Sequence, residues 1–241
     1  MAIAFDATSN SGYQTTTPYS WSHTCTGSSR VLIVGVSMLS VAGSSVTGIT
    51  YNGVALTKIR SDISAVGAVR TELWRLVNPA SGSNTVEVTL SATLDSIAAA
   101  VSLTGVNQTN PIGSHNGASA TNVGAADATV SVSTTADGSW LIDAVATTDT
   151  AITVGAGQTQ RSNVSGTLGS GGTSTEGPKT PTGSVTMSWT DVGAAATWTV
   201  SAVEIAEEQK AAVIYFPYKS TPNMTKTIAD TDGRIFRSLR K

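Results

Sequence analysis

Short β-branched runs separated by turn residues are the feature that most constrains how this chain can fold. Some runs are continuously apolar, such as Val31–Val36, and others alternate apolar and polar residues, such as Thr85–Leu90. The first kind is typical of a strand buried on both faces, the second of a strand buried on one. No segment of ten or more residues holds the 3.6-residue period of a helix. Strands are expected over Arg30–Ser40, Val46–Tyr51, Val54–Ile59, Val69–Val77, Thr85–Leu90, Asp95–Leu103, Ala128–Ser133, Trp140–Thr147, Ser184–Thr190 and Ala194–Ile205.

The turns between these runs point to an antiparallel architecture. Asn52-Gly53 stands between two runs and predicts a hairpin with a type I′ turn, in which both central residues need a positive φ. About nine to eleven strands with turn signals every 8–14 residues are typical of a sandwich or jelly roll. We therefore predict an all-β protein whose body is a jelly-roll-like antiparallel β-sandwich. The sequence shows no clear internal repeat.

Two long stretches interrupt the strand pattern. Residues 105–126 are rich in Asn, Gly, Ser and Ala, and residues 155–183 contain Gly-Ser-Gly-Gly and two prolines. Both stretches are expected to be loops. Long loops on a rigid scaffold are where binding residues commonly lie.

Composition excludes several classes of protein. Charged residues make up only 12% of the chain, against roughly 25% in an average domain, while Ser and Thr together number 68. A disordered chain would carry more net charge than −2, and a coiled coil would need heptads. The single cysteine, Cys25, cannot form an intrachain disulfide.

Nothing in the sequence predicts a membrane segment or a secretory signal. The longest apolar runs fall far short of the roughly 20 residues that a membrane span needs, and the first residues lack a basic region followed by an apolar one. We therefore expect a protein made in a host cytoplasm, with no membrane partner.

Charge is divided unequally along the chain. Residues 1–208 contain seven Lys and Arg against fourteen Asp and Glu, whereas residues 209–241 contain seven Lys and Arg against two Asp. The near-neutral total thus conceals an acidic part and a basic part. This division predicts a β-sandwich domain over 1–208 and a C-terminal arm over 209–241, which should meet an acidic partner.

The arm also carries apolar and aromatic residues that a segment of its length cannot bury alone. A neighbouring protein surface is the natural place for them. Four cations lie among the last eight residues, but the apolar residues between them favour a protein over a nucleic acid. The candidate docking residues are Tyr215, Phe216, Tyr218, Arg234, Phe236, Arg237, Leu239 and Arg240.

Three motifs carry a resemblance to a known family. They are Tyr51–Thr57 (YNGVALT), Leu73–Pro79 (LWRLVNP) and Ser102–Val106 (SLTGV). The pattern resembles a jelly-roll-like β-sandwich module of bacteriophage virion proteins, also seen in some bacterial surface proteins, over about residues 30–205. The resemblance implies a fold and a structural role in a virion. It implies no catalytic residues and does not reach the arm.

Catalytic and metal sites find little support in the sequence. The only histidines are His23 and His115, and no G-x-S-x-G motif accompanies them. His23 and Cys25 share a strand face, which predicts a packed cysteine beside a polar edge. One Cys and two separated His cannot complete a structural zinc site. The turn Asp230–Gly233 begins like a calcium loop but lacks the closing Glu. We expect no metal and no cofactor.

Asp143 is the most unusual carboxylate because it interrupts an apolar run. It is expected either to face solvent or a groove, or to be buried and paired with Arg30 or Arg70. A polysaccharide-degrading enzyme would need two carboxylates in one cleft. The candidates for such a pair are Glu72, Glu87, Asp95, Asp143 and Asp149. The five tryptophans are expected to lie mostly in the core.

These patterns favour a non-enzymatic virion protein. We expect it to form homo-oligomers and to attach as a capsid decoration, or as a head- or tail-associated protein, through its arm. Its partners would be other virion proteins. The alternative is a receptor- or glycan-binding module of a tail fibre or surface adhesin, which would use the stretches 105–126 and 155–183.

Overall fold

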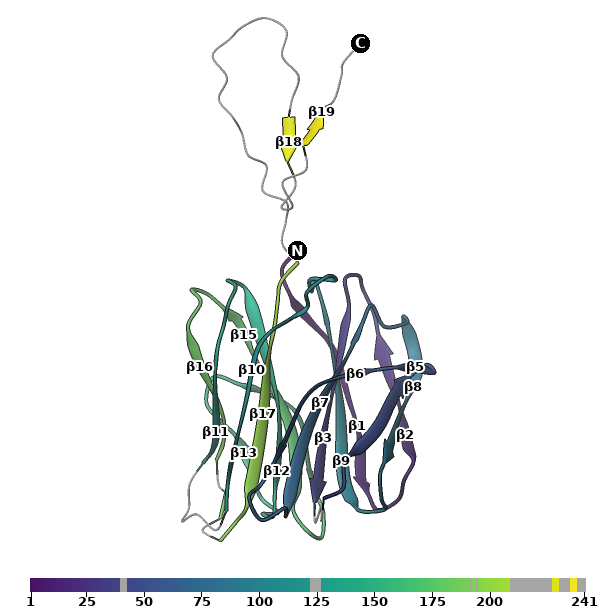
Figure 1. The fold of residues 1–241 in the computed structure, drawn as a ribbon, viewed down its shortest axis with the longest axis vertical. Coiled ribbons are helices and arrows are strands. Elements are labelled where there is room, and N and C mark those ends of the chain that lie inside the picture. The colour runs from purple at the N-terminus through teal and green to yellow at the C-terminus, as the bar shows by residue number, and fades with distance from the viewer. Residues whose placement is uncertain are drawn as a thin grey trace, which may run out of the picture. The chain divides into compact units, whose positions relative to one another are not determined.

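A computed structural model gives the structure of the chain and describes residues 1–39, 43–121, 127–190, 192–193 and 195–208, with the backbone of 227–229 and 235–237. The chain divides into two units. One is Ala2–Glu208, called the body below, and the other contains Met1 and Gln209–Lys241. The described part of the body is all-β, with antiparallel strands and no helix, as the sequence predicts (Figure 1). No described segment is a helix that could span a membrane.

The first half of the body is a jelly roll. One sheet has the order β1-β9-β3-β7-β6 and is called the first inner sheet; the first outer sheet has the order β2-β8-β4-β5. Strands that follow one another in sequence mostly lie in different sheets, as in two interlocked Greek keys. The strands are β1 (Ala4–Gln14), β2 (Tyr19–Cys25), β3 (Val31–Leu39), β4 (Val46–Tyr51), β5 (Val54–Ala55), β6 (Thr57–Ile63), β7 (Val69–Val77), β8 (Gly82–Leu90) and β9 (Asp95–Thr104).

The second half repeats this topology. Its inner sheet has the order β10-β17-β12-β15-β14 and its outer sheet the order β11-β16-β13, so every strand of the second half has a counterpart in the first. The body is therefore two jelly rolls, a repeat that the sequence does not reveal. The strands are β10 (Ile112–Ala120), β11 (Ala128–Ser133), β12 (Ser139–Thr147), β13 (Thr153–Val154), β14 (Thr159–Ser165), β15 (Ser170–Lys179), β16 (Ser184–Thr190) and β17 (Trp198–Ile205).

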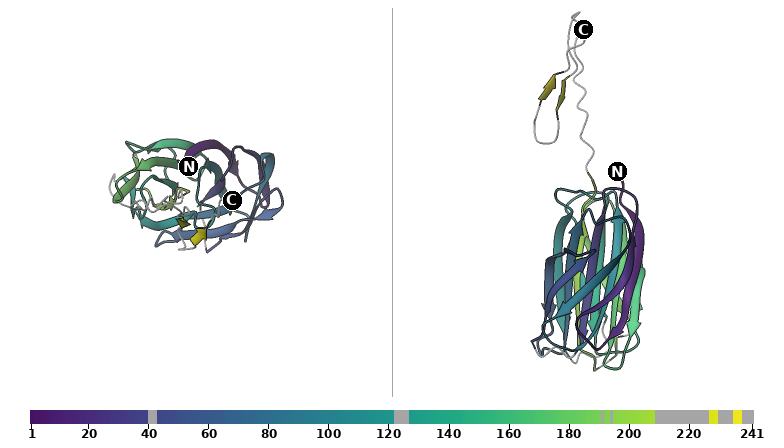
Figure 2. Two further views of the ribbon diagram at one scale, coloured as in Figure 1. Left: turned by 90° about the horizontal axis from the view of Figure 1, so that it is seen from above. Right: turned by 90° about the vertical axis from the view of Figure 1, so that its right-hand side faces the viewer.

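The two inner sheets pack face to face in reversed lateral order (Figures 1 and 2). Strand β1 faces β14, β9 faces β15, β3 faces β12, β7 faces β17 and β6 faces β10. Exchanging each strand for its counterpart leaves this set of contacts unchanged. The jelly rolls are therefore related by an approximate twofold axis, like the subunits of an isologous dimer.

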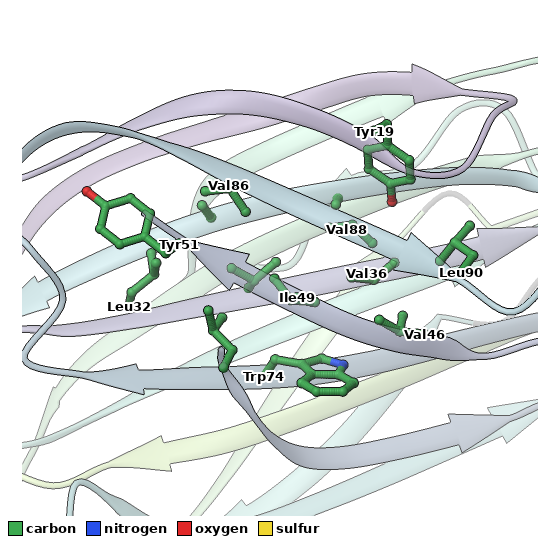
Figure 3. Close-up of a cluster of buried hydrophobic side chains, with 14 of the residues drawn as sticks. Tyr19, Leu32, Val36, Val46, Ile49, Tyr51, Trp74, Val86, Val88 and Leu90 are labelled. Atoms are coloured by element: carbon green, nitrogen blue, oxygen red, sulfur yellow. The ribbon is translucent and has the colours of Figure 1, made fainter. Parts of the chain in front are cut away.

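Each jelly roll has its own core, and a third core joins them. Strands of the first jelly roll enclose residues such as Leu32, Ile49 and Tyr51 (Figure 3). The second roll encloses Met187 and Trp189, among others. Between the inner sheets lie side chains of both rolls, listed here together: Ile3, Val31, Ile33, Leu73, Val101, Leu103, Val106, Ile142, Ala144, Val203 and Ile205.

The inner sheets approach each other closely at Gly35 of β3 and Ala144 of β12. A Cβ atom added to Gly35 would lie 2.9 Å from the Ala144 Cβ and 3.0 Å from Thr173 Cγ2. Glycine is needed here for space, because its neighbour across the interface fills the position of a side chain.

Every strand expected from the sequence overlaps an observed strand, and the Asn52-Gly53 turn is confirmed by φ values of 50° and 74°. The two expected loops are wrong. Strand β10 occupies Ile112–Ala120 within the first stretch, and strands β14 and β15 occupy most of 155–183. In β15, residues Ser170–Thr175 are buried. Their small, polar side chains suit two closely packed sheets, so the segment lacks the apolar signal of a buried strand.

Candidate functional site

The arm, which holds all of the predicted docking residues, is described only in part. Tyr215, Phe216, Tyr218, Arg234, Leu239 and Arg240 lie outside the described residues. Phe236 and Arg237 belong to β19 (Ile235–Arg237), whose backbone pairs antiparallel with β18 (Thr227–Ala229). The Asp230–Gly233 turn also lies outside the described residues.

The last residues of the body are held against the segment that joins the two jelly rolls. Glu208 N donates to Gly105 O over 2.9 Å, and Asn107 N donates to Ala206 O over 3.0 Å. Ser29 Oγ donates to a Glu208 carboxylate oxygen over 2.9 Å. This anchored end, Ala206–Glu208, fixes the point at which the chain continues into the arm.

One polar network of the body is centred on His23, which the sequence placed beside a polar edge. Trp21 Nε1 donates to Ser9 Oγ (2.9 Å), and Ser9 Oγ lies 2.8 Å from His23 Nδ1. His23 Nε2 lies 3.1 Å from Ser102 Oγ, which donates to Asp6 Oδ2 over 2.7 Å. Because Ser102 gives its proton to Asp6, its oxygen accepts from Nε2, which carries the ring proton.

This network contains the residue types of a hydrolytic triad without the setting of one. His23 is only 2% exposed, and burial lowers its pKa to about 4 despite the opposing charge of Asp6. Burial raises the pKa of Asp6, but hydrogen bonds from Thr26 and Ser102 outweigh it and leave that pKa lowered. Ser9 Oγ accepts from Trp21 Nε1 and Ser102 Oγ donates to Asp6, so both hydroxyl groups make contacts between strands. The network ties β1, β2 and β9 together.

Asp143 is buried, but its partner is not an arginine. Its carboxylate accepts from Ser174 N (2.7 Å), Ser174 Oγ (2.9 Å) and Trp189 Nε1 (2.9 Å). Gln158 Nε2 lies at 3.3 Å, while the Gln158 Oε1 accepts from Ser188 N. The expected pairing with Arg30 or Arg70 is therefore wrong. Backbone and neutral side-chain donors of β15 and β16 take the place of a cation.

Burial is the main influence on the protonation of Asp143. It raises the pKa of the carboxyl to about 6, against the opposing effect of the hydrogen bonds from Ser174, Trp189 and Gln158. A buried carboxylate without a cation loses its hydration, which favours the neutral form. The group joins the inner and outer sheets of the second jelly roll.

In both jelly rolls a carboxylate accepts hydrogen bonds from a threonine that follows the first strand of the outer sheet. In the first, Asp6 accepts hydrogen bonds from Thr26 N and Thr26 Oγ1, just after β2. In the second, Glu204 accepts them from Thr135 N and Thr135 Oγ1, just after β11. Burial raises the pKa of Glu204, but donors that include Ser139, Thr135 and Ser114 reverse the effect and lower it. The carboxylate comes from β1 in the first roll and from β17 in the second, and these two strands are not counterparts.

The remaining buried carboxylate, Glu72, has charged partners. Lys58 Nζ lies 2.8 Å and Arg70 3.6 Å from its oxygens, and Trp74 Nε1 donates to it over 3.1 Å. Glu72 contacts groups of the first roll, whereas Asp143 contacts the outer sheet of the second. These two carboxylates do not share a cleft, so they do not form the pair that a glycosidase needs.

Metal and aromatic sites complete the survey. Among the described residues, no group of three or more His, Cys, Asp or Glu is arranged to hold a metal ion. Trp74, Trp189 and Trp198 are buried, as expected of core residues, while Trp21 and Trp140 are partly buried. Cys25 is buried and free.

Comparisons with family models, curated proteins and solved structures give no match to this chain. The resemblance to virion modules therefore stays a prediction. The described body presents two packed jelly rolls whose buried ionisable groups join its layers, and its last residues are anchored where the arm begins.

Proposed function

We propose that this protein is a non-enzymatic structural component of a bacteriophage virion that docks onto neighbouring virion proteins through its arm. The observation that carries the proposal is the contrast between the two units. Within the described residues of the body, the buried carboxylates and His23 are all engaged between strands. The arm holds the apolar and cationic residues that need a surface.

Charge supports an acidic partner for the arm. Residues 209–241 carry a net charge of about +5 and the remainder about −7, from the same count of Lys, Arg, Asp and Glu. Opposite charges raise association rates and suppress wrong partners. An oligomer of this chain meets the requirement, because the body of one copy is acidic. A segment that adds contacts through a tether also increases avidity.

The receptor- or glycan-binding alternative has less support than docking through the arm. It needs long loops at 105–126 and 155–183, and these stretches contain β10, β14 and β15 of the second inner sheet.

Deleting the arm tests the proposal. Particles assembled with the full chain are compared with particles assembled with residues 1–208, and the copies per particle are counted by quantitative mass spectrometry. We expect occupancy to fall at least tenfold without the arm. A full-length control with Arg234, Arg237 and Arg240 changed to Ser separates charge from apolar contact. Full occupancy by the truncated chain contradicts the docking role.

A further inference from the structure

The repeat shows which part of the second jelly roll is missing. In the first outer sheet, the side of β8 that faces away from β2 pairs with β4 over Val46–Tyr51, and β5 follows β4. In the second outer sheet, β16 pairs on this side only with the two residues of β13. The second roll has no counterpart of β5 and a shortened counterpart of β4. One edge of β16 is therefore incompletely paired within the described chain.

The open part of the edge is defined by main-chain groups. Thr153 and Val154 pair with Thr190 and Trp189, and Gly155 N donates to Ser188 O. Ser188 N donates to the side chain of Gln158, which takes the place of a main-chain acceptor on a neighbouring strand. The chain then leaves this edge for β14. Since alternate residues of a strand point their N–H and C=O groups to the same side, those of Thr186 and Ser184 also face this edge.

The first jelly roll shows how this side of the strand is covered where β4 is complete. There, Glu87 pairs with Thr50 of β4, and Asn52 N donates to Thr85 O. Glu87 and Thr85 occupy in β8 the places that Ser188 and Thr186 occupy in β16, since Val88 and Trp189 each pair with the first residue of the neighbouring strand, Tyr19 of β2 and Ala128 of β11. Both Thr186 and Ser184 are exposed. An exposed, unpaired edge is a template for an added strand.

We propose that the edge Ser184–Met187 of β16 accepts an antiparallel strand from residues 211–216 of the arm of a second copy. This inference rests on the proposed docking role of the arm and names its partner. The segment reads Ala-Ala-Val-Ile-Tyr-Phe, followed by Pro217, and contains no Gly or charge. Such β-branched and aromatic residues suit a strand that is half buried. Strand addition obtains affinity from main-chain bonds and specificity from alternate side chains.

The length of the chain excludes the same copy as the donor. Ser184 lies at the end of the body where β17 finishes, because Thr134 N donates to Gly183 O while Glu204 accepts from Thr135. Only two residues separate Glu208 from Ala211, a reach of about 11 Å. In an antiparallel strand, Ala211 would have to lie beside Met187. That position is about 10 Å along the edge from Ser184 and one sheet spacing, about 10 Å, from the sheet that contains β17. A second copy has no such restriction.

Charge at the end of the edge agrees with this orientation. An antiparallel donor finishes beside Ser184, so Tyr218 and Lys219 follow at that end. The carboxylate of the exposed Asp137 lies there, since Asp137 Oδ1 accepts from Thr182 N. Lys219 of the donor can therefore meet a carboxylate of the acceptor.

Cysteine pairing between two full-length chains tests the inference. One chain carries Thr186→Cys and the other carries Ala212→Cys, Val213→Cys or Ile214→Cys in turn, the three positions that can lie opposite Thr186 when residues 211–216 cover the edge. Residues directly opposite in antiparallel strands have Cβ atoms about 4.5–5.5 Å apart, close enough for a disulfide after small adjustments. We expect a crosslinked heterodimer for at least one donor position. The matched control is Thr85→Cys, at the equivalent position of the first jelly roll, where Asn52 N donates to the edge.

Proline gives a second readout. Thr186→Pro removes the N–H group that points to the open edge. The ladder with β11 remains, because the main-chain groups of Met187 and Val185 are the ones that point to β11. We expect at least a tenfold loss of crosslinking to Ser184→Cys in chains carrying Thr186→Pro, and little loss with Thr186→Ala. Crosslinking of Thr85→Cys at the rate of Thr186→Cys, or none at Thr186→Cys, overturns the inference. If arm deletion still lowers occupancy, the docking role survives and the arm binds elsewhere.

Discussion

His23 connects three strands through one ring, and its partners explain why sequence reasoning found only part of its role. The sequence placed His23 and Cys25 on one strand face, and both are buried. It did not identify Asp6 and Ser102, which come from β1 and β9 and approach His23 only in the folded sheets. No short spacing marks such contacts.

Acid should weaken the fold through His23. Burial lowers its pKa from 6.5 to about 4, so the unfolded chain binds the proton more tightly. The stabilising contribution is complete above pH 6.5 and is lost as the pH falls from 6.5 towards 4. Between pH 7 and pH 5 the loss should be about 2 kcal/mol. Urea unfolding of the wild type and of His23→Gln at both pH values measures it, and equal changes in the two proteins would contradict the assignment.

Asp143 should titrate near neutrality with the opposite effect on stability. Burial raises its pKa from 3.8 to about 6, so protonation favours the folded state as the pH falls from 6 to 3.8. The indole proton of Trp189 reports it directly, since Trp189 Nε1 donates to the carboxylate. We expect its NMR shift to change with a midpoint of about 6 and to become flat in Asp143→Asn. A midpoint close to 3.8 would contradict the effect of burial.

Among the elements, strands with alternating or continuously apolar residues were predictable, including inner strands such as β3 and β12, whereas inner strands rich in small or polar residues, such as β10 and β15, were not. Residues Ala128–Ser133 alternate cleanly and form β11 as expected. Strand β15 is buried but reads as a Gly- and Ser-rich loop, because its neighbour across the interface leaves no room for large side chains. Strand β10 similarly resembles a loop in sequence. Close packing of two sheets is a property of the pair, which neither segment displays alone.

The spacing of the inner sheets should be sensitive to one methyl group. Gly35→Ala places a Cβ at 2.9 Å from the Ala144 Cβ and should lower the free energy of unfolding by about 1–3 kcal/mol through overpacking. Ala144→Gly removes the opposing methyl group, so the double variant should recover at least half of the loss. A double-mutant cycle from chemical denaturation measures the coupling. Additive losses would show that the two positions do not compete for space.

At the scale of the whole body, the approximate twofold axis makes each jelly roll the partner of the other. The shared core takes side chains from both inner sheets, and the last residues of β17 are tied to the segment that follows β9. Such an interface resembles that of a stable dimer with the two copies joined in one chain. The repeated topology without a clear repeat in sequence shows that the same arrangement of strands tolerates different side chains.

This sharing predicts that the two jelly rolls unfold together. Ile49 is buried in the core of the first roll only, and Ile49→Ala should cost about 2–5 kcal/mol. Its effect should reach the second roll, because loss of the first inner sheet exposes the shared core. The indole resonances of Trp74 and Trp189, one in each roll, report the two halves separately during a urea titration. We expect both midpoints to fall by the same amount in Ile49→Ala. If only the Trp74 midpoint falls, each jelly roll is stable without its partner. The approximate twofold interface would then contribute little to the fold.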